Sequence, residues 1–241
     1  MPMDGITLGA VAEELTAALS AGRVDRIQQP EKDEIVLTIR AGGKNHKLLL
    51  SANPNHARAH LTRAQVTSPD TPPMFCMLLR KHLSGARLLE LVQPPMERVV
   101  DLRLEALDEL GDRVERRLVL EAMGRRSNLI LLDGENRVID CMRRVDADMS
   151  ASRQVLPGLF YEPPASTGRL PFLEETEEGL AEKLAQVNPE IQLDRFLLDA
   201  YFGISPLMAR ELSFRACGET DGRLCNPDEA FRTLSLHLQT A

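Results

Sequence analysis

The sequence is poor in aromatic residues and cysteine: its 241 residues include no Trp, two Tyr and four Cys. Proteins that bind single-stranded nucleic acid by base stacking need aromatic side chains, so this class is disfavoured. The cysteines form no CxxC pair, which argues against structural zinc and is typical of reduced thiols in a cytoplasmic protein. They are Cys76, Cys141, Cys217 and Cys225.

Several signatures of membrane, export and enzymatic function are also missing. The sequence has no apolar run of about 18 residues, which predicts that no segment spans a membrane. It begins without a secretory signal. We find no Walker loop, no Rossmann glycine fingerprint and no nucleophile–base arrangement. We therefore expect no cofactor and no catalytic residue, and His46, His56, His60 and His82 lack the paired spacing of a metal site.

The charge is unevenly distributed. The net charge of −7 conceals a basic middle, because Asp70 is the single acidic residue from Ile35 to Leu89. Lys and Arg number 22 against 23 Asp and Glu in residues 1–165, and 7 against 13 in residues 166–241. A basic stretch of this kind is the electrostatic footprint of a phosphate-bearing partner.

A short helix within this basic stretch organises the chain. Asp70 and Thr71 can cap its start, Pro72 and Pro73 fit its first turn, and Gly85 ends it. Arg80, Lys81 and His82 occupy its last turns, where cations interact favourably with the helix dipole. An apolar stripe repeats at helical spacing at Phe75, Leu78, Leu79 and Leu83. The pattern fits a core helix with a solvated basic flank and also a nucleic-acid-binding helix.

Alternating patterns predict antiparallel strands before and after this helix. Glu34 to Ala41 and Lys44 to Ser51 flank Gly42-Gly43, the signature of a tight hairpin. Residues 53–71 read as a loop, with 57–62 as a short ordered piece. Further strands are predicted at 24–29, 88–92, 98–106, 114–123, 127–132 and 138–142. Val100, Leu102 and Leu104 should point inward, and Asp101, Arg103 and Glu105 outward. With a helix over 6–19, this predicts an α+β fold with an antiparallel meander.

The remaining sequence predicts a helical second domain. Residues 146–168 form a loop rich in Pro and Ser, and we place the domains at 1–170 and 171–241. Helices are expected at Thr176–Val187, Leu193–Tyr201, Ser205–Cys217 and Asp228–Gln239. The chain ends within the last of these, so we expect it to be a truncated piece of a longer protein.

Three local motifs could contact nucleic acid. Gly124-Arg125-Arg126-Ser127-Asn128 joins two guanidiniums to polar side chains in a turn, which suits phosphate or sugar contact and equally suits a plain charged turn. Glu97 and Arg98 open a strand, either as a surface ion pair or as a donor–acceptor pair. Gly203-Ile204-Ser205-Pro206 precedes a helix, where backbone N–H groups can hold a phosphate or where two helices simply connect.

Several long motifs lie in residues 1–164: Met3-Asp4-Gly5, Ile39 to Asn45, Leu48 to Ala52, Pro72 to Leu83, Glu121 to Ile130 and Leu156-Pro157-Gly158. Together they resemble the NFACT-N domain of the RqcH/NEMF family of ribosome-associated quality-control factors, also called fibronectin-binding proteins. Residues 166–241 look like the family's helix-hairpin-helix type domain, and Gly203 to Ala216 is also similar to the helix-two-turn-helix of formamidopyrimidine-DNA glycosylases. We expect the family's coiled coil and NFACT-R domain to lie outside residues 1–241.

The resemblance implies a glycosylase-like N-terminal fold and a protein that binds the large ribosomal subunit carrying stalled peptidyl-tRNA. Such proteins engage tRNA and promote untemplated C-terminal tailing, with alanine in bacteria. The family's tRNA-contacting acid–arginine pair falls on Glu97 and Arg98. Glu97 replaces the usual Asp of bacterial relatives and moves the carboxylate outward by one methylene. Arg126 replaces the His of the family's Gly-Arg-His-Ser-Asn pattern and adds charge.

Two other functions stay open. A DNA glycosylase or lyase would use an N-terminal amine at Pro2, although Met3 replaces the Glu that follows in that family. A fibronectin adhesin would need export, and no signal is present. Our leading hypothesis is a cytoplasmic RNA-binding module with Glu97 and Arg98 at the tRNA site. Further nucleic-acid contacts are expected from Arg40, Lys44, His46, Arg58, His60, Arg80, Lys81, Arg125, Arg126, Ser127 and Asn128.

Overall fold

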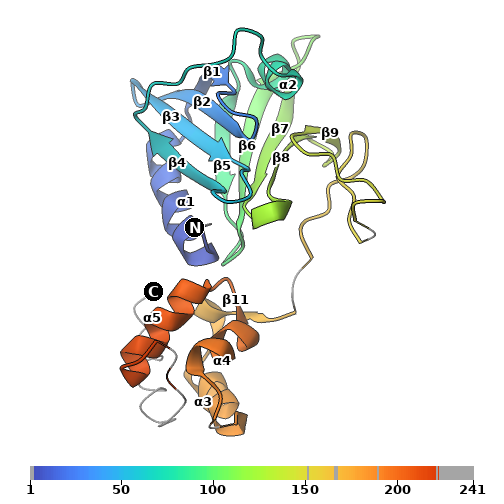
Figure 1. Ribbon diagram of the computed structural model, residues 1–241. Coiled ribbons are helices and arrows are strands. Elements are labelled where there is room, and N and C mark those ends of the chain that lie inside the picture. Colours follow the sequence, from blue (N-terminus) through green and yellow to red (C-terminus); the bar gives the residue numbers. More distant parts are fainter. Residues whose placement is uncertain (1–2, 151, 166–167, 189, 221, 223–241) are drawn as a thin grey trace. The chain divides into compact units, whose positions relative to one another are not determined.

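The chain forms two compact units (Figure 1). The computed structural model describes residues 3–150, 152–165, 168–188, 190–220 and 222. The first unit comprises Met1–Met3, Thr7–Pro94 and Arg98–Pro164, and the second comprises Asp4–Ile6, Pro95–Glu97 and Ala165–Ala241. Each unit has its own hydrophobic core.

An antiparallel sheet, nine-stranded within the described residues, forms the first unit, in the order β4-β3-β2-β1-β5-β6-β7-β8-β9. This sheet, with its helices and the small helical second unit, confirms the predicted α+β class. The strands are β1 (Arg23–Gln28), β2 (Glu34–Ala41), β3 (Lys44–Ser51), β4 (Arg58–Thr62), β5 (Arg87–Val92), β6 (Val99–Leu107), β7 (Arg113–Glu121), β8 (Asn128–Asp133) and β9 (Val138–Cys141).

The β2–β3 hairpin forms as its sequence predicts. Ala41 pairs with Lys44, and the two glycines between them have φ of 55° and 77°. Positive φ at both central residues suits a tight turn that matches strand twist. The alternation of β2 is confirmed in the core, where Ile35, Leu37 and Ile39 lie together.

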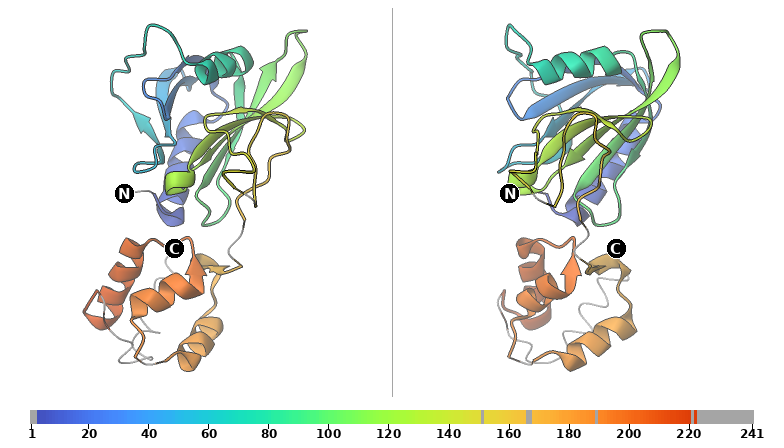
Figure 2. Two further views of the ribbon diagram at one scale, coloured as in Figure 1. Left: turned by 45° about the vertical axis from the view of Figure 1, so that its right-hand side comes forward. Right: turned by 90° about the vertical axis from the view of Figure 1, so that its right-hand side faces the viewer.

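Two helices pack their apolar faces against the sheet and share one core with strands β1 to β8. Helix α1 (Gly5–Leu19) contributes Leu8, Leu15 and Leu19, and helix α2 (Met74–Leu83) contributes Phe75, Leu79 and Leu83. Figures 1 and 2 show α1 running along the sheet and α2 lying across one end of it. Helix α2 contacts β1, β6 and β9, so the curled sheet and this helix enclose one core.

Helix α2 differs from the prediction at its start. Pro73 occupies the N-cap position without a side-chain cap, so Asp70 and Thr71 lie before the helix and do not cap it. Pro72 and Pro73, which were predicted in the first turn, also precede Met74, the first residue of the helix. On the apolar face, Leu78 is only half-buried, and Cys76 is fully buried in its place.

A fourth strand replaces part of the predicted loop. Residues 58–62 form β4, which pairs with β3 from Lys47↔Thr62 to Ser51↔Arg58. Five residues with two small or apolar side chains give little periodic signal, and pairing with β3 supplies the strand geometry that propensity alone does not.

The second face of the sheet is covered near β7 and β8. Val155 and Tyr161, from the segment that follows β9, pack there against Val119, Ile130 and Leu132. Asp101 was predicted to point into solvent and is instead buried on this face, since the segment covers it. Its carboxylate accepts a bond of 2.9 Å from Arg117 Nε, which offsets the cost of burying the charge.

The second unit confirms three of the predicted helices to within one residue. They are α3 (Glu177–Gln186), α4 (Leu193–Ala200) and α5 (Pro206–Cys217), accompanied by the short strands β10 (Leu170–Pro171) and β11 (Tyr201–Phe202). The helix predicted at 228–239 lies outside the described residues. The side chains of Thr176 and Ser205 cap α3 and α5.

The core of the second unit centres on Tyr201. Its ring meets Phe172 and Phe196 edge-to-face at 5.3 Å and 6.3 Å between centroids. Met96, a distant residue in the sequence, joins this core and has a φ of 59°, a region that non-glycine residues rarely adopt. Segments 4–6 and 95–97 therefore belong to the packing of this unit.

Candidate nucleic-acid interface

Arg98 lies immediately before β6 and has a fixed backbone. Its carbonyl accepts a hydrogen bond of 2.8 Å from the N–H of Ala122, just beyond the end of β7. The side chain is half-buried, and among the described residues its guanidinium makes no hydrogen bond or ion pair. Glu97 is also half-buried and belongs to the second unit, whereas Arg98 belongs to the first.

The strand register places the arginine-rich turn at the same end of the sheet as Arg98. Val99 pairs with Glu121, and Glu121 pairs with Asn128, so the segment between β7 and β8 begins next to Arg98. Residues Gly124–Arg126 form the short 3₁₀ helix η1. The side chains of Arg125 and Arg126 are exposed and unpaired within the described part of the chain.

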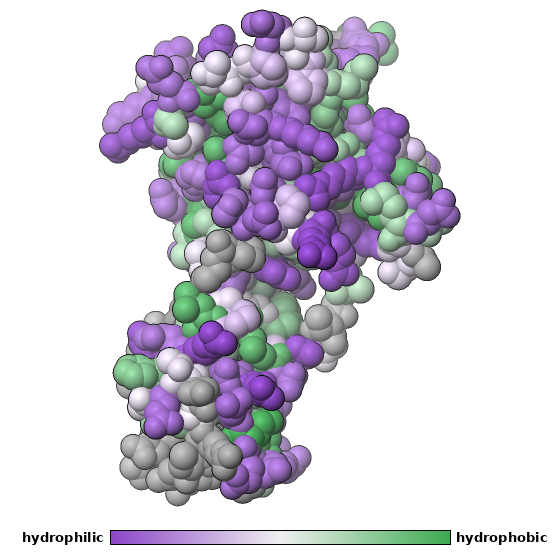
Figure 3. Space-filling model, in the orientation of Figure 1, coloured by the Kyte–Doolittle hydropathy of each residue, from purple (hydrophilic) through white to green (hydrophobic). Residues whose placement is uncertain are grey.

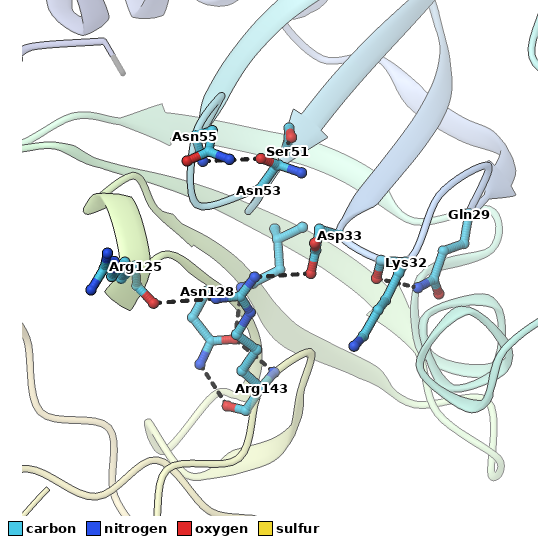
Figure 4. Close-up of polar contacts among 10 residues, drawn as sticks. Gln29, Lys32, Asp33, Ser51, Asn53, Asn55, Arg125, Asn128 and Arg143 are labelled. Atoms are coloured by element: carbon cyan, nitrogen blue, oxygen red, sulfur yellow. Dashed lines mark hydrogen bonds and ion pairs between the residues drawn. The ribbon is translucent and has the colours of Figure 1, made fainter. Parts of the chain in front are cut away.

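Gly124 lies beside the loop after β3. It has a φ of 59°, and a Cβ built on it would make ordinary van der Waals contact, at 3.8 Å, with the carbonyl oxygen of Pro54. This contact brings residues 53–56 beside the arginine turn. Asn55 and the backbone there add polar groups to the same end of the sheet, as Figure 4 shows.

Ser127 and Asn128 are both buried. The Asn128 amide donates 2.8 Å to the carbonyl of Arg143 and accepts 2.9 Å from its N–H. Arg143 in turn donates to the carbonyl of Arg125 at 3.2 Å and to the Asp33 carboxylate at 3.0 Å (Figure 4). This network holds the turn in place and leaves the two exposed guanidiniums free to meet a ligand.

Sequence reasoning missed Arg143 and Asp33, which are 110 positions apart. It also missed a buried clasp nearby, in which Arg153 binds the Glu121 carboxylate at 3.0 Å and 2.5 Å. The hydroxyl of Tyr161 donates to the same carboxylate at 2.9 Å, and burial together with Glu121 raises the pKa of this tyrosine. No local pattern could reveal pairs so distant in sequence.

Arg58 and His60, on β4, lie on the face that also carries Glu34. Arg58 donates 3.0 Å to Glu34 and 2.8 Å to the carbonyl of His56, so its charge is already paired. Burial, followed by the nearby Arg58, lowers the pKa of His60 and favours its neutral form.

The other predicted residues are distributed elsewhere. Arg80 donates 3.0 Å to the carbonyl of Ile27 and ties α2 to β1, while Lys81 pairs with Glu109 at 2.7 Å on the surface. Arg40 and Lys44 flank the β2–β3 turn, which is the opposite end of those strands from Arg58. His46 pairs with Ile39 near the same turn and is half-buried.

The structure thus divides the candidate basic residues between two ends of the sheet. Arg98, Arg125 and Arg126 gather at one end, whereas Arg40 and Lys44 lie at the other. The face of the first unit seen in Figure 3 is mostly hydrophilic.

Neither a metal centre nor a membrane span is found among the described residues. They contain no group of three His, Cys, Asp or Glu side chains that could hold a metal ion. No helix in the described ranges has both the length and the apolar content needed to cross a bilayer. Cys76, Cys141 and Cys217 are not in disulfides, and burial raises the pKa of Cys141 to about 12.

The comparison with protein families is decisive. The sequence pattern of the NFACT N-terminal and middle domains matches residues 4–235. The chain belongs to the NFACT family. Its relatives include the Rqc2 homolog RqcH of Bacillus subtilis, which is 39% identical over 217 residues, and the archaeal Rqc2 homolog aRqcH of Methanocaldococcus jannaschii, which is 28% identical over 214 residues. The match covers 90% of this chain and 38% of the bacterial relative, and 86% and 30% for the archaeal one.

Solved structures from the NFACT family share the fold. The N-terminal part of the fibronectin/fibrinogen-binding protein of Streptococcus suis is 32% identical with a TM-score of 0.84, over 99% of this chain and 85% of that one. The N-terminal domain of the fibronectin-binding protein PavA of Streptococcus pneumoniae is 33% identical with a TM-score of 0.80, over 87% and 78%. The predicted membership of the RqcH/NEMF family is therefore confirmed.

Proposed function

We propose that this chain is the RNA-binding part of a cytoplasmic ribosome-associated quality-control factor and has no enzymatic activity by itself. In this proposal, the whole protein binds the large ribosomal subunit that carries a stalled peptidyl-tRNA. It engages tRNA for untemplated C-terminal alanine tailing. Relatives that carry the Rqc2 homolog name support the proposal, and the chain spans 38% of the bacterial one.

The observation that carries the tRNA contact is the arrangement around Arg98. Its backbone is held by Ala122, its guanidinium is unpaired within the described residues, and Arg125 and Arg126 follow in the adjacent segment. Guanidiniums recognise phosphate oxygens bidentately, and phosphate contacts position a protein on RNA. We propose that Glu97 and Arg98 contact tRNA, and that Ser127 and Asn128 position the arginine turn.

We also propose the finer architecture. Residues 1–170 form an NFACT-N domain with a glycosylase-like fold, and residues 171–241 form a helix-hairpin-helix type domain. Among the remaining basic residues of the candidate set, Arg58, Arg80 and Lys81 bind RNA more weakly, because each already makes an internal bond.

Fluorescence anisotropy with deacylated tRNA and with duplex DNA of similar length, each at two salt concentrations, tests this function. We expect salt-sensitive preference for tRNA, and Arg98→Ala should weaken tRNA binding several-fold while lowering the salt slope by about 0.9 for each phosphate that it no longer neutralises. Arg113→Ala, at the other end of the β6–β7 hairpin and 77% exposed, is the matched control. Equal tRNA affinity of folded Arg98→Ala and the native chain would remove Arg98 from the site.

Two alternatives have their own readouts. A covalent adduct with abasic DNA, trapped by borohydride, would favour the glycosylase function, whose candidate amine at Pro2 lies outside the described residues. The similar streptococcal structures are described as fibronectin-binding proteins, and tight binding of purified fibronectin by this chain would favour that function.

A further inference from the structure

Three arginines form one row across the first unit, far along the strands from Arg98. Arg40 of β2 pairs with Arg23 of β1, and Arg23 pairs with Arg87 of β5. Directly opposite residues of antiparallel strands point to the same face, so the three side chains lie side by side. All three residues are exposed.

The spacing of this row is tight. The N–H of Leu88 bonds to the carbonyl of Gly22 at 2.8 Å, and that of Val24 bonds to the carbonyl of Ala86 at 2.9 Å. These two bonds flank Arg23 and Arg87 and make them a non-hydrogen-bonded pair, whose Cα atoms lie about 4.5 Å apart. Like charges directly opposite one another destabilise a sheet, so the row costs free energy in the unbound protein.

Little inside the molecule offsets this repulsion. Arg23 donates to the carbonyl of Gly85 at 3.3 Å, and in the described ranges the guanidiniums of Arg40 and Arg87 make no hydrogen bond or ion pair. Glu105 stands opposite Arg87, but its carboxylate pairs with Arg113 at 3.6 Å.

The surroundings leave the row open to a large ligand. The Gly42–Gly43 turn borders it, and a Cβ at either glycine would meet no atom within 4 Å. The connection from β4 to α2 crosses the same face of the sheet, where Lys47 bonds to the carbonyl of Ala64 and Gln28 to that of Val66. Lys47 and Gln28 pair with residues two and four positions along β2 from Arg40, so the crossing leaves the arginines exposed.

We infer that this arginine row, Arg23, Arg40 and Arg87, binds the phosphate backbone of an RNA strand at a second site. The choice of RNA over another polyanion rests on the proposed function. Three adjacent guanidiniums, with no aromatic side chain in the row, suit contact with the backbone without reading of sequence. The protein would then hold RNA at both ends of its sheet.

The test is RNA binding by the triple variant Arg23→Gln/Arg40→Gln/Arg87→Gln, measured by anisotropy with a short RNA duplex across a salt series. The control removes equal charge at exposed positions outside the row, as Arg137→Gln/Arg210→Gln/Arg215→Gln. We expect the RNA affinity of the row variant to fall at least about ten-fold at low salt, because three phosphates would no longer be neutralised. For the same reason, the slope of log affinity against log salt concentration should become shallower by about 2 to 3. An equal loss in both variants, or tighter binding of polyglutamate than of RNA by the native chain, would overturn the inference.

Thermal unfolding supplies a second readout that a structural role would not produce. Because the row is repulsive, Arg23→Gln should raise the melting temperature at low salt and lose this gain at high salt. A lower melting temperature would assign Arg23 to the fold through its bond to Gly85. The two proposals can fail separately. If the row variant loses RNA affinity and Arg98→Ala keeps its tRNA affinity, the tRNA site alone is refuted. If Arg98→Ala loses tRNA affinity and the row variant keeps its RNA affinity, the row alone is refuted.

Discussion

The buried clasp around Glu121 allows a sharp prediction about stability. Glu121→Gln keeps the shape of the side chain and removes its charge. Glu121 is 2% exposed, and it accepts two bonds from Arg153 and one from Tyr161. In the variant the guanidinium of Arg153, with a side chain 20% exposed, would lose its counter-charge.

The magnitude follows from the degree of burial. Removing one partner of a fully buried ion pair costs about 3–5 kcal/mol, since an uncompensated charge stays behind. Arg153 keeps some contact with water and its bond of 2.6 Å to the carbonyl of Glu162, so we expect the lower end, about 3 kcal/mol. For a unit of this size that corresponds to roughly 6–12 °C in melting temperature.

Tyrosine signals make the assay specific to one unit. The sequence has two tyrosines, and a Tyr201→Phe background leaves Tyr161 as the reporter of the first unit during urea unfolding. Glu135→Gln is the control, because Glu135 is 80% exposed and lies 3.7 Å from Arg137, a surface pair worth at most about 1 kcal/mol. A loss below about 1 kcal/mol in Glu121→Gln would refute the view that this clasp secures the covering segment.

Two further outcomes are expected. In the second unit Gly203 has a φ of 86°, and a Cβ built on it would lie 2.6 Å from that of Met96. Gly203→Ala should therefore lower the free energy of unfolding of this unit by about 1–3 kcal/mol, measured by Tyr201 fluorescence. The loss should exceed that of Gly218→Ala, where φ is 76° and the added Cβ would meet no atom within 4 Å. Burial lowers the pKa of His60 and of His82 below the usual 6.5, so the folded state favours the neutral imidazoles. Their contribution to the free energy of unfolding is fully present above pH 6.5 and is lost as the pH falls through the folded-state pKa. Melting temperatures on either side of that pH should show this loss, and a His60→Gln/His82→Gln variant that keeps the full dependence would contradict it.

Much of the fold could be predicted because its signals are local. The Gly42–Gly43 turn, the alternation of β2 and β6, and the helical periodicity of α2 each lie within about ten residues. What failed depends on tertiary context: β4 is a strand because β3 pairs with it, and Asp101 is buried because a later segment covers it. Periodicity reports which residues share a face, but not what lies over that face.

The candidate site was only partly readable for the same reason. The sequence showed that Arg125 and Arg98 were basic residues near strand ends, but only the register shows that those ends coincide. It grouped Arg40 with Arg58, although they lie at opposite ends of the β2–β3 pair. Residues that hold others in place, such as Arg143, had no signal, because a single arginine in a loop is ordinary.

The seam between β1 and β5 bears on how the first unit assembles. Short connections join the strands from β5 to β9. By contrast, β1 pairs with β5 only at Arg23↔Arg87, and β2, β3, β4 and α2 lie between these two strands in the sequence. Closing that long loop carries the larger entropic cost, so the two halves should form early and join late. In native-state hydrogen exchange the amides of Val24 and Leu88, which bridge this seam, should exchange together and ahead of those in the centre of β6 and β7.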